Sequence, residues 1–217
     1  MKNYSTFIFD LDGTLLNTIE DLAAAVNYSL RSCSMPERSL EEVLHFVGNG
    51  VRKLMARAVP DGERNPLFER AFDSFRSYYM THSIDNTKPY DGVMAMLETL
   101  KSRGCKTAVV SNKFDAATKE LCNHFFGGLV DVVIGENEAG GIRKKPAPDT
   151  VNEALSQLNV DKHDAVYIGD SEVDIATAKN SGIPCISVLW GFRDRGFLEA
   201  NGATTFVTAP HEIIDFS

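Results

Sequence analysis

The first apolar segment of the chain, residues 5–9, is too short for a helix and ends abruptly at Asp10-Leu11-Asp12-Gly13-Thr14. This pattern predicts a buried strand that leads into an acidic turn. From Thr18, apolar residues recur at helical spacing as far as residue 30. The same spacing continues in residues 40–47, 51–59 and 66–84. We therefore expect a small helical domain in this part of the chain.

After Lys88-Pro89 the pattern becomes an alternation of helical segments and short β-branched runs. It predicts helices at residues 93–101, 116–124, 149–158 and 173–180, and strands at residues 107–110, 130–134, 165–168 and 185–188. Such alternation is typical of an α/β fold, in which a parallel sheet is connected by crossover helices. We expect a Rossmann-like core of residues 1–15 and 89–217, with residues 16–88 inserted as a small helical domain.

The composition is that of an ordinary globular protein, with 217 residues of which 43% are hydrophobic and 24% charged. The net charge of -8 argues against a general attraction to nucleic acid or to an anionic membrane. No apolar run approaches the roughly 20 residues that span a bilayer, so we expect a cytoplasmic protein. The four cysteines form no C-x-x-C pair, which argues against a zinc or redox motif. The sequence does not determine the oligomeric state.

Polar side chains occur at the predicted carboxyl ends of three strands. They are Asp10 and Asp12 after the first strand, Ser111 and Asn112 after the second, and Gly169-Asp170-Ser171 after a later one. A parallel sheet brings such ends to one edge, where α/β folds bind ligands. Two carboxylates followed by a glycine and a hydroxyl can supply a nucleophile, a proton donor and ligands for Mg²⁺. A surface turn is the structural alternative, because Asp-Gly is common in turns.

Four short motifs resemble those of the haloacid dehalogenase superfamily, in its phosphatase branch. Asp10-Leu11-Asp12-Gly13-Thr14-Leu15 resembles the first motif and Ser111-Asn112 the second. Lys145-Pro146 is similar to the third motif, and Gly169-Asp170-Ser171-Glu172-Val173-Asp174 to the fourth. The motifs follow the order of that family, so the chain resembles a phosphoglycolate phosphatase-like hydrolase.

The resemblance implies a role in catalysis for three residues. Asp10 would attack phosphorus to form an aspartyl-phosphate intermediate, and would also bind Mg²⁺. Asp12 would protonate the leaving oxygen and then activate water, while its backbone carbonyl binds the metal. Lys145 would offset the negative charge that accumulates around the transferred phosphoryl group.

Five further residues would bind phosphate or metal. Thr14, Ser111 and the backbone of Asn112 would bind the phosphoryl oxygens, and Asp170 would complete the metal shell. Asp174 would be a direct ligand, or an acceptor that orients the catalytic lysine or a metal-bound water. Three structural alternatives remain. Ser-Asn after a strand often starts a loop, a lysine in the run Arg143-Lys144-Lys145 is usually a solvated charge, and an aspartate suits a helix N-terminus.

The helical insertion resembles the cap of this superfamily, a domain that closes over the site and selects the substrate. Its segment Phe46-Val47-Gly48-Asn49-Gly50-Val51-Arg52 is similar to the substrate loop of the phosphoglycolate phosphatase group. The candidate substrate-binding residues are therefore Gly48, Asn49, Gly50 and Arg52. The alternative is a glycine that ends one helix before an exposed arginine in the next.

The leading hypothesis is a Mg²⁺-dependent phosphatase for phosphoglycolate or another small phosphorylated metabolite. A pyrophosphatase, a nucleotidase or a sugar-phosphate phosphatase of the same superfamily are alternatives. A phosphomutase is disfavoured because the family's mutases carry a different residue where Thr14 stands. A dehalogenase is disfavoured because that branch carries a single acidic residue in the first motif, whereas this sequence keeps Asp12 and also Asp170. A non-catalytic binding module is disfavoured because Asp10, Asp12, Ser111, Lys145 and Asp170 are all present.

Overall fold

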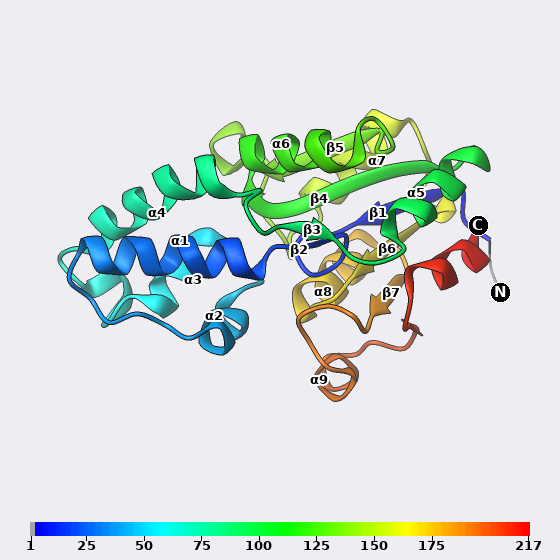
Figure 1. The fold of residues 1–217 in the computed structure, drawn as a ribbon. Coiled ribbons are helices and arrows are strands. Elements are labelled where there is room, and N and C mark those ends of the chain that lie inside the picture. The colour runs from blue at the N-terminus through cyan, green and yellow to red at the C-terminus, as the bar shows by residue number, and fades with distance from the viewer. Residues whose placement is uncertain (1–2) are drawn as a thin grey trace. The chain divides into compact units, whose positions relative to one another are not determined.

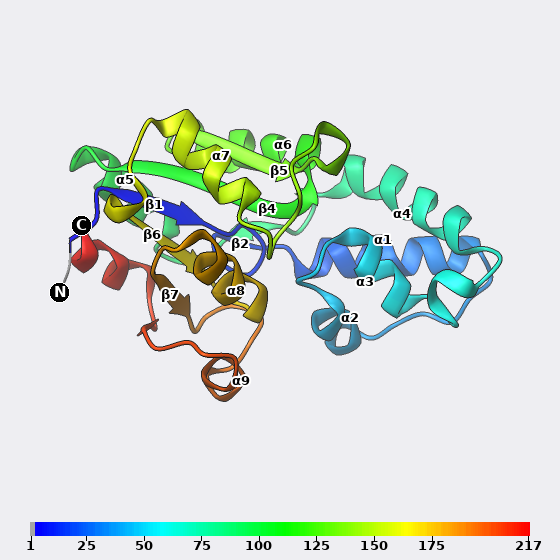
Figure 2. The same cartoon turned by 180° about the vertical axis from the view of Figure 1, so that it is seen from behind.

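The computed structural model describes residues 3–217, which divide into two compact units. One unit consists of the chain up to Leu16 together with Pro89–Ser217, and the other of Asn17–Lys88. Figures 1 and 2 show the α/β core of the first unit and the helices of the second from opposite sides. The strands β2 and β3 pair as a two-stranded sheet at the two points where the chain passes from one unit to the other. Their bounds are Leu16–Asn17 for β2 and Lys88–Pro89 for β3.

The first unit is built on a six-stranded parallel sheet in the order β5-β4-β1-β6-β7-β8. The strands are β1 (Thr6–Phe9), β4 (Lys106–Phe114), β5 (Val132–Glu136), β6 (Ala165–Gly169), β7 (Cys185–Val188) and β8 (Phe206–Val207). After β5 the chain returns to the far side of β1, so the strand order reverses at β1. Ligands bind at such a switch point in open α/β sheets. The predicted Rossmann-like parallel core is confirmed.

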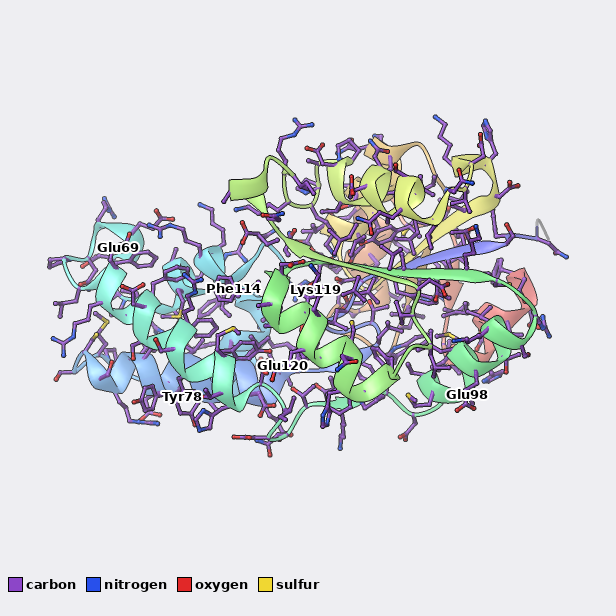
Figure 3. All side chains as sticks on the ribbon, turned by 90° about the horizontal axis from the view of Figure 1, so that it is seen from above. Glu69, Tyr78, Glu98, Phe114, Lys119 and Glu120 are labelled. Atoms are coloured by element: carbon purple, nitrogen blue, oxygen red, sulfur yellow. The ribbon has the colours of Figure 1, made fainter. Side chains whose placement is uncertain are left out.

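Helices cover both faces of this sheet because alternate residues of each strand point to opposite sides. Phe7 and Phe9 of β1 pack in one buried cluster, whereas Ile8 packs in another. The first face carries α5 (Val93–Ser102), α6 (Asp115–Phe126) and the 3-10 helix Pro210–Phe216, and the second carries α7 (Asp149–Leu158) and α8 (Glu172–Ser181). Figure 3 marks Glu98 on α5 and Glu120 on α6, both of which are exposed.

The second unit is helical, as the spacing of its apolar residues predicts. Its helices are α1 (Ile19–Ser32), α2 (Leu40–Phe46), α3 (Val51–Ala58) and α4 (Phe68–His82), with a 3-10 turn at Gly62–Arg64. The buried carboxylate of Asp21 fastens the start of α1 to the end of the unit. It accepts hydrogen bonds from the backbone N–H and side-chain amide of Asn86, and from the backbone N–H and hydroxyl of Thr87. This arrangement satisfies a carboxylate that would be costly to bury alone.

The strand predicted at residues 107–110 is too short, since β4 extends to Phe114. Ser111 and Asn112 therefore lie within the strand, although its pairing with β5 is irregular between Val110 and Phe114. Polar residues indicate a strand end only when they face water, and these two side chains are buried. The pattern also misses β2, β3, β8, α9 (Arg195–Ala200) and the 3-10 turns Glu138–Gly140 and Lys162–Asp164, which are too short to show a period.

The four cysteines are free thiols, two of them buried and two half-buried. Among the helices of residues 3–217, none is long and apolar enough to cross a bilayer.

Candidate active site

Lys145 stands at the centre of the residues that the sequence singled out. Its ammonium group donates hydrogen bonds to Asp10 Oδ1 at 2.6 Å and to Asp174 Oδ1 at 2.9 Å. The Tyr167 hydroxyl accepts a third at 3.2 Å. Burial alone would lower the pKa of Lys145, but the charges of Asp10 and Asp174 raise it overall. The lysine is therefore a fixed positive charge beside the Asp10 carboxylate.

The backbone of Lys145 is held by the side chain of Asn112. The Asn112 Nδ2 donates to the Lys145 carbonyl at 3.0 Å, and the Lys145 N–H donates to Asn112 Oδ1 at 2.8 Å. The peptide bond that follows, Lys145-Pro146, is cis. The sequence predicts a phosphate-binding role for the Asn112 backbone and gives no role to its side chain. In the folded chain this side chain connects β4 to Lys145.

Asp174 has hydrogen-bond donors on both carboxylate oxygens and is fully buried. Its Oδ1 accepts from Lys145 and from the Tyr167 hydroxyl, the latter at 2.9 Å. Its Oδ2 accepts from the Ser171 hydroxyl at 2.6 Å and from the Ser171 N–H at 3.1 Å. The bond from the Ser171 N–H, together with the bond from the Asp174 N–H to Ser171 Oγ at 3.4 Å, forms the capping box of α8. Gly169 precedes this turn, and a Cβ there would overlap Asp174. The carboxylate thus joins the N-terminus of α8 to Lys145.

Asp170 is enclosed by two backbone segments. Its Oδ2 accepts a hydrogen bond from the Phe192 N–H at 2.6 Å, and Thr14 Oγ1 lies 3.5 Å from Oδ1. A Cβ on Gly13, whose φ is +85°, would overlap the Asp170 carboxylate. Trp190 Nε1 donates to the Thr14 carbonyl at 2.9 Å, which ties the two segments together. The sequence did not indicate that residues 190–192 support the aspartate.

The carboxylates of Asp10, Asp170 and Asp174 are close enough to hold a metal ion, with one oxygen from each within 4.8 Å of the others. Burial and the charge of Asp174 raise the pKa of Asp10 to about 7, although Lys145 opposes the shift. Burial, Asp174 and Asp10 raise the pKa of Asp170 well above its usual range. Buried carboxylates that repel one another are relieved by a cation, so the donor set fits a hard divalent ion.

The second aspartate of the first motif pairs with a lysine that the sequence analysis did not select. Lys113 Nζ lies 2.9 Å from Asp12 Oδ1, and the lysine side chain is 1% exposed. The Lys113 N–H also donates to Ser111 Oγ at 3.2 Å. The sequence could have indicated Lys113, because this residue directly follows the Ser111-Asn112 motif.

The sequence matches the haloacid dehalogenase-like hydrolase family over residues 7–188, which include the four aspartates and both lysines of this site. The chain belongs to this family. It is 34% identical over 186 residues to the phosphoglycolate phosphatase of Aquifex aeolicus, covering 85% of this chain and 84% of that one. With the phosphoglycolate phosphatase of Neisseria meningitidis it shares 35% identity over 211 residues, 94% of this chain and 88% of the relative.

The fold is also similar to that of a solved structure. The crystal structure of a candidate phosphoglycolate phosphatase from Lactobacillus delbrueckii subsp. bulgaricus matches at a TM-score of 0.92 and 35% identity, covering 99% of this chain and 98% of that one. Together these relatives identify the chain as a phosphatase and confirm the resemblance inferred from its motifs.

In the helical unit of the phosphatase, the predicted substrate loop is ordered by Arg57. The guanidinium of Arg57 donates to the Phe46 carbonyl and to Asn49 Oδ1, both at 2.6 Å. Gly48 and Gly50 adopt φ values of +125° and +88°, which other residues rarely reach. Arg57 itself was not among the predicted residues, although it lies in the helix that follows the loop.

Arg52, predicted to contact substrate, makes its contacts within the helical unit. Its guanidinium lies 2.5 Å from Glu69 Oε1 and 3.6 Å from Glu63 Oε2. It also stacks over the rings of Phe68 and Phe72, at 5.0 and 5.4 Å from the ring centroids. These contacts fix the direction of its side chain, and its role in substrate binding stays a prediction.

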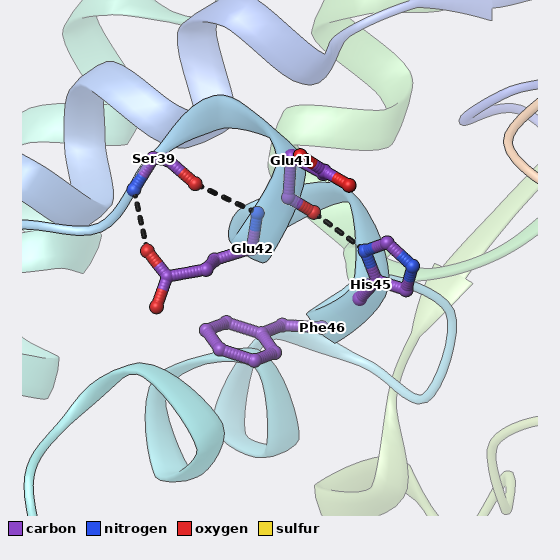
Figure 4. A pocket seen from close by; sticks show the side chains of 5 residues that line it. All are labelled: Ser39, Glu41, Glu42, His45 and Phe46. Atoms are coloured by element: carbon purple, nitrogen blue, oxygen red, sulfur yellow. Dashed lines mark hydrogen bonds between the residues drawn. The ribbon is translucent and has the colours of Figure 1, made fainter.

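A hollow on the phosphatase's helical unit is lined by Ser39, Glu41, Glu42, His45 and Phe46. Figure 4 shows that its polar groups bond to one another: Ser39 and Glu42 form the capping box of α2, and His45 Nδ1 lies 2.7 Å from the Glu41 carbonyl. Local helix geometry accounts for these groups without a ligand.

Proposed function

We propose that this phosphatase hydrolyses a small phosphate monoester, with phosphoglycolate as the leading substrate, through an aspartyl-phosphate on Asp10. The observation that carries the proposal is the Asp10 carboxylate at the end of β1, 2.6 Å from the ammonium of the buried Lys145. A carboxylate nucleophile beside a fixed cation can approach a phosphate dianion, whose charge would otherwise repel it.

In the first step, a carboxylate oxygen of Asp10 attacks phosphorus while the bond to the ester oxygen breaks. Asp12 donates a proton to that leaving oxygen. In the second step, Asp12 takes a proton from the water that attacks the phosphoryl group, and inorganic phosphate and free Asp10 result. Lys145, the Ser111 hydroxyl and the backbone of Asn112 stabilise the charge on the phosphoryl oxygens, and Thr14 contributes beside them.

We also propose Mg²⁺ as the cofactor, held by the carboxylates of Asp10 and Asp170 and by the backbone carbonyl of Asp12. When bound, the ion supplies positive charge that neutralises substrate and carboxylates together. Asp174 acts as a positioning residue in this proposal, because its two oxygens already accept four hydrogen bonds from Lys145, Tyr167 and Ser171.

Substrate choice is assigned to the helical unit, as a cap whose loop at residues 46–52 meets the part of the substrate beyond the phosphate. Support for a small acid comes from the relatives named phosphoglycolate phosphatase, which are 34% and 35% identical over most of the chain. Such a metabolite, together with the acidic net charge of -8, is consistent with a cytoplasmic enzyme without a nucleic-acid partner.

The test is phosphate release from 2-phosphoglycolate, pyrophosphate, nucleoside monophosphates and hexose phosphates, with Mg²⁺ or with EDTA. We expect release that depends on Mg²⁺, a preference for phosphoglycolate, and loss of turnover in Asp10→Asn. Calorimetry with the same variant should still detect substrate binding in the presence of Mg²⁺. Turnover that survives in Asp10→Asn would exclude the aspartyl-phosphate route, and a preference for another ester would exclude the substrate assignment alone.

A further inference from the structure

Lys113 is a buried cation to which the proposed mechanism gives no task. The residue is 2% exposed and lies near the carboxyl end of β4. Burying an ammonium group is unfavourable unless it is paired and hydrogen-bonded. Its ammonium meets Asp12 Oδ1 at 2.9 Å, so the ion pair offsets the cost of burying the charge.

The two aspartates of the first motif therefore each have a lysine of their own. Lys145 contacts Asp10 at 2.6 Å, and Lys113 contacts Asp12 at 2.9 Å. Lys113 lies in β4 and Lys145 in the segment before α7, which argues for two separate roles. Lys145 neutralises charge at the nucleophile, whereas Lys113 contacts the group that transfers protons in the proposed function.

The surroundings of Asp12 explain why it needs such support. Its side chain is 15% exposed, on the turn after β1, whereas the side chain of Asp174 is fully buried between fixed donors. A carboxyl group in a turn can rotate away from the substrate unless something restrains it. A hydrogen bond from a buried ammonium to one oxygen restrains that rotation, because the lysine is fixed in a central strand.

We propose that Lys113 is a positioning residue that holds the Asp12 carboxyl group toward the leaving oxygen of the substrate. The proposal rests on the proposed function, in which Asp12 protonates that oxygen. It also explains why Lys113 directly follows Ser111 and Asn112. One strand end then orients the phosphoryl oxygens through Ser111 and the proton donor through Lys113, and the Lys113 N–H bond to Ser111 Oγ links the two.

The proposal makes the effect of Lys113 depend on the leaving group. An alkoxide leaves poorly without a proton, whereas p-nitrophenolate leaves as an anion and hardly needs one. The experiment compares kcat/KM for the best alkyl phosphate with kcat/KM for p-nitrophenyl phosphate. This constant reports the steps through cleavage of the ester bond and excludes later hydrolysis of the aspartyl-phosphate.

We expect Lys113→Met, which approximately keeps the length of the side chain but removes its charge, to lose about 10- to 100-fold in kcat/KM with the alkyl phosphate. With p-nitrophenyl phosphate the loss should stay below about 3-fold. Lys113→Arg should restore part of the alkyl activity. The matched control is Lys119→Met, which removes an exposed lysine of α6 and should leave the ratio of the two constants unchanged.

Two further variants separate failure of this inference from failure of the proposed function. Asp12→Asn should show the same dependence on the leaving group, and adding Lys113→Met to it should cost nothing more with the alkyl phosphate. If Asp12→Asn loses both substrates equally, the proton-donor role of Asp12 fails, and this inference with it. Two other results would overturn only the role of Lys113. In the first, Asp12→Asn loses activity mainly with the alkyl phosphate, whereas Lys113→Met loses equally with both substrates. In the second, the loss in the double variant equals the product of the losses in the two single variants.

The readout does not require full folding of the variants. The ratio of the two kcat/KM values is independent of the concentration of active enzyme, so a partly folded preparation gives the same answer. Should Lys113→Met yield no folded protein, Lys113→Gln serves the same comparison, because it retains a polar group while removing the charge. A wild-type ratio in Lys113→Gln would contradict the proposal.

Discussion

The side-chain amide of Asn112 and the peptide groups of Lys145 form a reciprocal pair of hydrogen bonds, 3.0 and 2.8 Å long. Both residues are buried. The pair joins β4 to the segment that carries Lys145, the proposed catalytic lysine, across 33 residues of sequence. The pair therefore fixes the position of the Lys145 backbone, while Asp10 and Asp174 fix the position of its ammonium group.

Replacing Asn112 with alanine should lower kcat by about 10- to 100-fold, because an ångström of misplacement is enough to cause such a loss. The buried N–H and C=O of Lys145 would also lose their partners, at about 1–3 kcal/mol each in unfolding free energy. Steady-state kinetics and urea unfolding measure the two effects. Asn180→Ala is the matched control, since Asn180 bonds the Pro146 carbonyl at 2.8 Å from an exposed position. Equal kinetic effects in both variants would contradict the role of Asn112.

Removing the hydroxyl of Tyr167 should weaken the hydrogen-bond network that holds the ammonium group of Lys145. The hydroxyl donates to Asp174 and accepts from Lys145, and burial raises its pKa well above the usual range, so it remains protonated. In Tyr167→Phe we expect a loss of about 1–3 kcal/mol in unfolding free energy, typical of a buried bond to a charged group. Tyr28→Phe, at an exposed tyrosine of α1, should change neither the unfolding free energy nor kcat. Wild-type stability and kcat in Tyr167→Phe would show that the network does not depend on this hydroxyl.

Without metal, the stability of the phosphatase should fall as pH rises from about 4 to about 7. Burial and Asp174 raise the pKa of Asp10 from 3.8 to about 7, so the folded chain holds this proton more tightly than the unfolded chain. The stability that this proton contributes is fully present below about pH 4 and is lost as pH rises through about 7. Urea unfolding in EDTA across this range measures the slope.

Two changes should reduce this dependence of the unfolding free energy on pH. Mg²⁺ binds the ionised carboxylates, so saturating Mg²⁺ should restore stability above pH 7. Asp10→Asn removes the ionisable group and should make the metal-free protein more stable than wild type at neutral pH. A metal-free wild type whose stability increases steadily between pH 5 and 7 would contradict the shifted pKa of Asp10.

The predicted substrate loop should depend on Arg57 for its shape. In Arg57→Ala the hydrogen bonds to the Phe46 carbonyl and to Asn49 are lost, and we expect KM for the preferred substrate to rise about 5- to 20-fold, the effect of one or two weakened contacts. Activity on p-nitrophenyl phosphate, which lacks the acid group, should change less. Arg31→Ala removes an exposed arginine paired with Glu37 in the same unit and should leave both substrates unaffected. An equal rise in KM for both substrates would point to a general structural effect.

Much of the fold and of the site follows from local pattern. Residues 5–9 are apolar and end at paired aspartates, and the later β-branched runs alternate with helices, because a parallel sheet requires buried strands and crossover segments. Asp10, Ser111 and Asp170 are recognisable because polar side chains at the predicted strand ends suit phosphate and metal chemistry, whereas Lys145 was found only through its resemblance to a family motif.

The supporting contacts could not be derived in this way. That the Asn112 side chain holds Lys145, that the Phe192 backbone binds Asp170, and that Lys113 pairs with Asp12 all depend on segments that meet only in the folded chain. The sequence determined which residues can do chemistry, because residue type limits charge and nucleophilicity. Only the tertiary structure decided which partner each one has, because partners are chosen by distance in space and a buried charge must be neutralised by whatever the fold brings within reach.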